Sequence, residues 1–379
     1  MTMRLFINRL VAVFLAISLT FVSFSLPAHA ASQAGSACTK SGAATILSPG
    51  VKLVCSKSGK KLLWAKVPVV KVVAASFSSQ DIEKAVADSW AVWRTNKLNA
   101  TPKLLLKSQA GYSSDWQVVT KKAVTYLLNV LNGNGLKMVP TPFFAFGETE
   151  EFRAKAFKES GCKAPYMKDM EMAIYCAAAD IGSGGLRLGR PGEPMANGYK
   201  LTDQDIKLLT YIDLHEVAIF YEAQAQYGNV AYDGTKSQIP SWLREGTAQI
   251  VALLGANDLI TPGGAYSEFK ADGRTVGPKP EGLCDKDLQD YEGMDKHWSS
   301  NCTNSQNFYA VELLVAMHGG FDALYNFDIL YGKNEDWTAD FKKAFGISRE
   351  EFYKEWYSYL GIPQTQWPTI RAPKPAEHY

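Results

Sequence analysis

The sequence predicts an α+β protein in which a mostly helical domain with a small sheet follows a small disulfide-stapled β-hairpin module. Three observations carry this prediction: long segments with a helical spacing of apolar residues, a few short apolar runs typical of strands, and one early cysteine pair that brackets a turn. Hydrophobic residues make up 46% and charged residues 21% of the 379 residues. This composition is that of an ordinary globular protein, and it excludes a disordered or low-complexity chain.

The near-neutral net charge argues against one class of binding partner, nucleic acid. The formal net charge is only +2, whereas a protein that binds nucleic acid normally carries a clear basic excess. We therefore expect no nucleic-acid partner. After residue 30 there is no run of about 18 uninterrupted apolar residues, so we predict no membrane span in the mature protein. We expect a monomer.

Residues 1–30 have the pattern of a secretory signal peptide. Arg4 and Arg9 give a positive start, an apolar stretch follows over 10–26, and an Ala-His-Ala site ends at Ala30. The sequence therefore predicts cleavage after Ala30 and a secreted or extracytoplasmic location in the cell envelope. A retained membrane anchor is the less favoured interpretation, because a proline and the small-residue site stand where a stop-transfer flank would be.

The six cysteines agree with export, because an even number of cysteines in an oxidising compartment favours disulfide bonds. Six cysteines allow 15 pairings, and the sequence does not decide among them. Nearest-neighbour pairing is our working hypothesis, and each such loop would stabilise the fold by ~3 kcal/mol. It joins three local pairs: Cys38 with Cys55, Cys162 with Cys176, and Cys284 with Cys302.

Residues 31–66 are predicted to form the small hairpin module. Val51–Cys55 alternates like a strand, a Ser-Gly-Lys turn follows, and 61–66 reads as a second strand that contains Trp64. This segment resembles short cysteine-containing modules of bacterial secreted proteins. Trp64 and the lysines could touch a cell-wall polymer, but we favour a hairpin core with solvated lysines. Residues 67–80 are interpreted as a linker.

Residues 81–368 are predicted to form the larger domain, and 369–379 a C-terminal tail. A Thr202–Asp205 capping pattern begins the longest helix. The glycine-rich stretch at 182–189 fits no phosphate-binding motif and is interpreted as a loop. In chain order, helices are expected over 81–97 and 114–132, a strand over 142–146, a helix opening at 149–152, a strand over 172–178, and a helix over 203–227.

Two motifs between 211 and 250 carry the chemistry. The long helix contains Leu-His-Glu-Val-Ala-Ile over 214–219, and Ile-Pro-Ser-Trp-Leu-Arg-Glu-Gly-Thr-Ala follows over 239–248. In a zinc peptidase, H-E-x-x-H puts two imidazoles one helical turn apart, and the glutamate between them acts as general base toward a zinc-bound water. A glutamate from a second helix completes that site. Here the position of the second histidine is Ile219.

These motifs resemble the gluzincin metallopeptidases, specifically the bacterial peptidase MA-like group. Three further segments are similar to that family: a strand-then-helix entry at 143–152, a helix ending in glycines at 309–320, and a closing helix pair at 344–356, where Ser348 and Glu351 form a capping box. The resemblance covers about residues 140–360. It implies a zincin-like fold for the larger domain.

The resemblance also assigns roles to individual residues. It implies His215 as first metal ligand, Glu216 as general base and Glu245 as third ligand, with Tyr309 facing the cleft as a donor to the oxyanion. Ile219 breaks the pattern, because isoleucine offers no lone pair and a catalytic zinc normally has three protein ligands. The sequence therefore predicts an incomplete zinc site.

Three hypotheses remain open. We favour a secreted metallopeptidase-like protein without bound zinc, a non-catalytic cell-envelope protein that binds a peptide, a protein or a cell-wall polymer. The alternative is an active zinc metallopeptidase that uses a non-standard third ligand, such as His297, His318 or an acid. The third hypothesis is a structural or adhesive envelope protein in which exposed aromatic residues bind carbohydrate.

Overall fold

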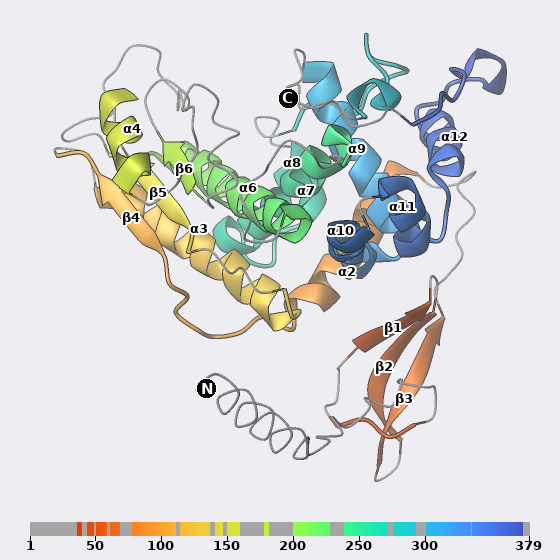
Figure 1. Cartoon of the computed structure of the whole chain (residues 1–379), viewed down its shortest axis with the longest axis horizontal. Helices are drawn as coiled ribbons and strands as arrows, with labels where there is room; N and C mark the ends of the chain where they lie inside the picture. Colours follow the sequence, from red (N-terminus) through yellow and green to blue (C-terminus); the bar gives the residue numbers. More distant parts are fainter. Residues whose placement is uncertain are drawn as a thin grey trace, which may run out of the picture. The chain divides into compact units, whose positions relative to one another are not determined.

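The chain folds as two compact units, which divide between residues 67 and 68 (Figure 1). They are described separately. The structure is a computed structural model, and it describes residues 36–39, 44–48, 51–58, 61–68, 78–110, 114–136, 141–146, 150–159, 178–181, 200–227, 239–271, 276–292, 301–334 and 336–373. The predicted signal peptide, the Cys162–Cys176 pair and the glycine-rich stretch at 182–189 lie outside these residues.

The first unit is a three-stranded sheet with the order β1-β2-β3, formed by β1 (Ala44–Ser48), β2 (Val51–Ser58) and β3 (Lys61–Pro68). The predicted disulfide between Cys38 and Cys55 is present. The predicted hairpin is β2 and β3, and the prediction was incomplete because β1 adds a third strand. The β1 sequence, Ala-Thr-Ile-Leu-Ser, is too short to show a clear alternation of apolar and polar residues. The sequence therefore did not predict this strand.

The second unit is mostly helical and contains a small parallel sheet, which confirms the coarse fold class. The structure does not by itself identify the zincin-like fold. Its strands are β4 (Leu105–Ser108), β5 (Phe143–Phe146) and β6 (Ala178–Ile181). Its helices are α2 (Ser79–Arg94), α3 (Ser114–Gly133), α4 (Glu150–Glu159), α6 (Asp203–Tyr227), α7 (Ser241–Ile260), α8 (Tyr266–Ala271), α9 (Asn301–Met317), α10 (Gly320–Asn334), α11 (Trp337–Phe345) and α12 (Arg349–Tyr359), with the 3-10 turns η2 (Leu288–Tyr291) and η3 (Gln364–Gln366).

The sheet has the order β4-β5-β6 with all strands parallel. All four residues of the central strand β5 are buried, which suits its uninterrupted apolar sequence, because a central parallel strand is covered on both faces. The sequence predicted β5, but it missed β4. The strand expected at 172–178 is described only from residue 178 onward, where β6 begins.

The helix starts follow the predicted capping chemistry. At the start of α6, the backbone N–H of Thr202 donates to the Asp205 carboxylate at 2.8 Å, and the Asp205 N–H donates to the Thr202 hydroxyl at 3.2 Å. Ser348 and Glu351 make the same reciprocal pair at the start of α12. Both boxes satisfy N–H groups that have no partner inside the helix. The bounds of α6 are the predicted residues 203–227.

Helix α7 is the centre of this unit and packs between α6 and α9 (Figure 1). Nearly all of its residues from Ser241 to Asn257 are buried. Near its start, the ring of Trp242 stacks on Phe352 of α12 with a centroid distance of 5.5 Å. Among the described residues, no helix is both long and apolar enough to cross a membrane.

The contact between α7 and α9 depends on Gly246. A Cβ atom at this position would lie 2.3 Å from the carbonyl oxygen of Asn307 and 2.5 Å from a methyl group of Val311. The first neighbour is backbone, so the two helices would have to separate. We expect Gly246→Ala to lower the free energy of unfolding by about 1–3 kcal/mol, measured by urea denaturation.

Gly255 supplies a matched control in the same helix. The three nearest neighbours of an added Cβ there are side-chain atoms of Leu214 and Tyr126, the closest being a methyl group of Leu214 at 3.0 Å. Since alanine is the better helix former by up to about 1 kcal/mol, Gly255→Ala is expected to be neutral or stabilising. Equal effects of the two substitutions would contradict the proposed role of Gly246.

Candidate functional site

The packing of α6 against α7 places His215 beside Glu245. The Nε2 atom of His215 lies 3.4 Å from a carboxylate oxygen of Glu245, and both side chains are largely buried. The two residues come from the two separate sequence motifs, and they meet because α6 and α7 lie side by side in the core. The two residues to which the resemblance assigned the first and third ligand roles are therefore in contact.

Ile219 lies one helical turn after His215, about 6 Å further along α6. Its side chain is 2% exposed and belongs to the main hydrophobic core of the unit. Its role here is packing: it contributes apolar surface where a zinc peptidase has its second imidazole. Burying a side chain of this kind stabilises a fold by about 1.5–3 kcal/mol.

Arg244 supplies a cation to the same carboxylate. Its Nη2 atom lies 3.3 Å from the other oxygen of Glu245, so that this carboxylate stands between a guanidinium and an imidazole. Burial lowers the pKa of His215, but the hydrogen bond to Glu245 and the charges of Glu245 and Glu216 outweigh burial, so the pKa is raised overall. Arg244 and His215 therefore lie against the two oxygens of Glu245, and the chain itself supplies groups that compensate its charge.

This arrangement does not fit a catalytic zinc ion. Zinc and a proton compete for the same nitrogen of His215, and without a metal the contact with Glu245 raises the pKa of this imidazole. The guanidinium of Arg244 also lies against the carboxylate of Glu245 and would repel a divalent cation. Within the segments that the structure describes, no group of three or more His, Cys, Asp or Glu residues could hold a metal ion. No reaction step through zinc is derived from these residues.

Tyr309 belongs to a different polar cluster. Its hydroxyl donates to the carbonyl oxygen of Gly277 at 3.3 Å, and its ring lies 4.3 Å from the ammonium group of Lys270. Lys270 in turn forms a buried ion pair with Glu312 at 2.8 Å. These contacts give Tyr309 a structural role in the packing of α8 against α9. The oxyanion role that the resemblance implied for Tyr309 stays a prediction.

His318, one of the histidines considered as substitute ligands, pairs with a residue of another helix. His318 follows the end of α9, and its Nε2 atom lies 2.7 Å from a carboxylate oxygen of Glu355 on α12. His297 lies outside the described residues. Glu216 is half-buried next to His215, and its charge acts on both His215 and Asp213.

A pair of buried carboxyl groups nearby was missed by the sequence reasoning. Glu222 on α6 is 1% exposed and Asp328 on α10 is 3% exposed. Neither oxygen of Glu222 accepts a hydrogen bond from any residue in the described segments. Burial, and then the charges of Asp328 and Glu245, raise the pKa of Glu222 well above its ordinary value. The signal that could have identified Glu222 is a glutamate within an apolar helical stretch.

No protein-family model matches the chain, and no curated protein or solved structure gives a significant match. The resemblance to the gluzincins therefore stays a prediction that rests on the motifs themselves.

Proposed function

We propose that this protein is an exported, metallopeptidase-like binding protein of the cell envelope in which an ion-paired cluster has replaced the catalytic metal. The observation that carries the proposal is the compensation of Glu245 by His215 and Arg244, next to a buried Ile219. In a metal site, the positive charge of the metal ion neutralises the negative charge of its carboxylate ligands. Here His215 and Arg244 lie against the carboxylate of Glu245 instead.

The proposed location has independent physical support. Both described disulfides, Cys38–Cys55 and Cys284–Cys302, are of the kind that persists in an oxidising compartment. The partner class stays as the sequence predicted it, namely a peptide, a protein or a cell-wall polymer. The Trp residues Trp90, Trp93, Trp116, Trp242 and Trp356 are buried, which weakens the third hypothesis of an aromatic carbohydrate-binding face.

Metal retention by the mature protein tests the proposal. We expect the wild type, purified without chelator and reconstituted with zinc, to retain no stoichiometric zinc by mass spectrometry. Ile219→His supplies the missing imidazole one turn after His215, and it is expected to gain zinc if the scaffold is zincin-like. Combining it with Arg244→Gln should tighten retention further, because the competing cation is removed.

Ile219→Asn is the matched control, since it places a polar group at the same buried position without a metal-binding imidazole. Circular dichroism of each variant verifies that it is folded. Near-stoichiometric zinc in the wild type, lost in Glu245→Ala, would contradict the proposal and favour an active peptidase with another ligand. Absence of zinc in the folded double variant, Ile219→His with Arg244→Gln, would contradict the zincin-like scaffold.

A further inference from the structure

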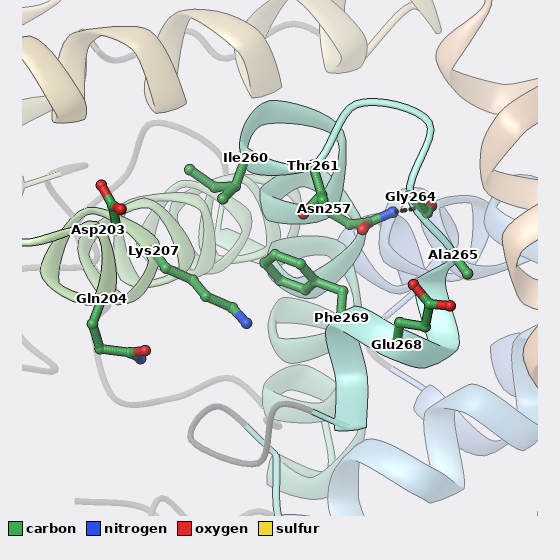
Figure 2. A pocket seen from close by; sticks show the side chains of 10 residues that line it. All are labelled: Asp203, Gln204, Lys207, Asn257, Ile260, Thr261, Gly264, Ala265, Glu268 and Phe269. Carbon is green, nitrogen blue, oxygen red and sulfur yellow. Dashed lines mark hydrogen bonds between the residues drawn. The ribbon is translucent and has the colours of Figure 1, made fainter.

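A separate hollow lies between the first turns of α6, the end of α7 and α8 (Figure 2). Its volume is about 380 Å³, and ligand-binding pockets start at about 300 Å³. Lys207, which lines it, precedes His215 by two turns, about 12 Å along α6. The hollow is therefore distinct from the cluster around Glu245.

One buried polar atom in its wall marks a position for a hydrogen-bond donor. Asn257 is 8% exposed, and its Nδ2 donates to the carbonyl oxygen of Gly264 at 3.2 Å (Figure 2). This bond fixes the amide orientation, because the opposite assignment would set two oxygens against each other. The Oδ1 atom of Asn257 accepts no hydrogen bond from any described residue. A buried acceptor of this kind is costly unless something donates to it.

The charges and the apolar wall of the hollow favour a cation. Asp203 from α6 and Glu268 from α8 place two exposed carboxylates on opposite walls, against the single ammonium of Lys207 (Figure 2). That ammonium lies 4.1 Å from the ring centroid of Phe269, so it already rests on an aromatic face. The lining therefore carries a net negative charge, and Phe269 and Ile260 supply apolar surface.

We propose that this hollow binds the primary ammonium group of a small amine. An ammonium has three N–H donors and no acceptor, so it can donate to the Asn257 oxygen while its charge is balanced by Glu268 and Asp203. The aliphatic part of the amine packs on Phe269 and Ile260. A small anion fits less well, since it would face two carboxylates and one ammonium that is already in contact with an aromatic ring.

Titration of the mature protein with four probes of similar size tests this proposal. The probes are n-butylammonium, tetramethylammonium, n-butanol and acetate, followed by calorimetry and by amide NMR shifts of the residues that line the hollow. We expect saturable binding of n-butylammonium only. Tetramethylammonium has the charge but cannot donate to Asn257, and butanol lacks the charge.

Two variants locate the binding. We expect Glu268→Gln and Asn257→Ala each to weaken n-butylammonium by about tenfold, the loss of one charge-assisted hydrogen bond. Glu268 is exposed, so its variant tests the proposal without disturbing the core, whereas Asn257 also ties the α7–α8 turn through Gly264. Glu281→Gln, at a different hollow, is the matched control and should leave binding unchanged.

Several results would overturn the proposal. These are no saturable shift with n-butylammonium, equal binding of tetramethylammonium or butanol, preferential binding of acetate, or equal weakening by Glu281→Gln. Each would assign the Asn257 oxygen to solvent or the hollow to another ligand chemistry.

Discussion

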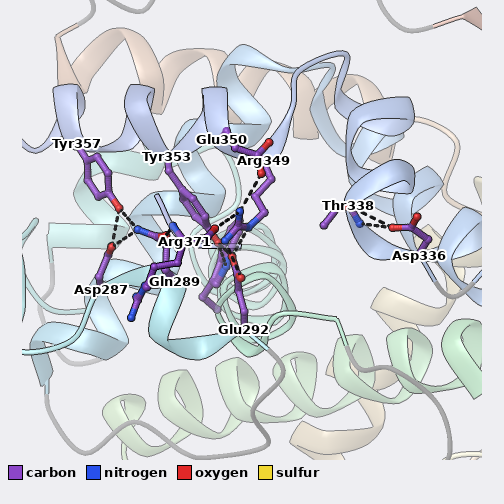
Figure 3. Close-up of polar contacts among 11 residues, drawn as sticks. Asp287, Gln289, Glu292, Asp336, Thr338, Arg349, Glu350, Tyr353, Tyr357 and Arg371 are labelled. Atoms are coloured by element: carbon purple, nitrogen blue, oxygen red, sulfur yellow. Dashed lines mark hydrogen bonds and ion pairs between the residues drawn. The ribbon is translucent and has the colours of Figure 1, made fainter. Parts of the chain in front are cut away.

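Replacing Arg349 by methionine is expected to lower the free energy of unfolding by about 3–5 kcal/mol, the cost of leaving a buried charge without its partner. Arg349 and Glu292 form a two-pronged ion pair, with Nε–Oε1 at 2.5 Å and Nη2–Oε2 at 2.8 Å (Figure 3). Their side chains are 1% and 0% exposed. The hydroxyl of Tyr353 also donates to Glu292, so two side chains of α12 stabilise this buried carboxylate.

The same pair fastens the segment after α8 to α12. Asp287 and Gln289, a few residues before Glu292, bond to the hydroxyl of Tyr357 at 2.6 Å each (Figure 3). Nearby, the hydroxyl of Ser241 at the start of α7 donates to the carbonyl oxygen of Tyr291 at 3.2 Å. Loss of the ion pair should therefore loosen the segment that packs beside the start of α7.

Urea denaturation at pH 7 measures this effect, with Arg371→Met as control. The Arg371 side chain is 47% exposed and pairs with Asp290 at 2.9 Å, so its removal is expected to cost less than about 1 kcal/mol. The double variant Arg349→Met with Glu292→Leu removes both charges and should recover much of the loss. If Arg349→Met is no more costly than Arg371→Met, the pair does not stabilise the fold as described.

The second large effect concerns Glu222 and depends on pH. Its folded pKa is raised by burial and by the charges of Asp328 and Glu245, and the cation of Arg244 opposes this only in part. Above the ordinary value of 4.5, the unfolded chain releases a proton that the folded chain retains, so stability is lost as pH rises. Each pKa unit of elevation corresponds to about 1.4 kcal/mol.

Glu222→Gln keeps the shape of the side chain and removes its titration. We expect the variant to match the wild type at pH 4 and to be more stable than it at pH 8, by more than about 1 kcal/mol, in urea denaturation. Tyr221 and Tyr325 also face this region. Burial, and then the carboxyl charges, raise the pKa values of both tyrosines, and measurements stay at pH 8 or below.

Glu351→Gln serves as a control with the opposite sign. Hydrogen bonds from Ser348 lower the pKa of Glu351, so its contribution is present above its ordinary pKa and is lost as pH falls. The control should therefore lose stability at pH 8 and match the wild type at low pH. A parallel pH response of the two variants would contradict the assigned pKa directions.

The parts of the fold that could be predicted from the sequence are those determined by interactions between residues close together in the chain. The bounds of α6 followed from a capping box at Thr202 and a periodic apolar face, which are local signals. Helix α8 was not among the helices expected from the sequence. Only six residues long, it is held by distant contacts such as Tyr266 to Glu312 at 2.9 Å.

In the candidate site, too, contacts that follow from sequence motifs could be predicted, and contacts that depend on how distant helices pack could not. The contact between His215 and Glu245 could be anticipated from two motifs on successive helices. The proximity of Glu222 to Asp328 could not, because it depends on how α10 returns to lie against α6. The ion pair of Arg244 with Glu245 was also missed, since adjacent residues on a helix normally point to different sides.

The close approach at Gly246 changes what the Trp-Leu-Arg-Glu-Gly signature can be taken to diagnose. The tryptophan fills the core and the glycine allows two backbones to meet, so helix packing alone accounts for much of the signature. Packing alone can therefore preserve these residues, whether or not a chain carries out any chemistry. In this fold the signature reports how two helices meet, and the buried Ile219 one turn after the histidine serves the same packing.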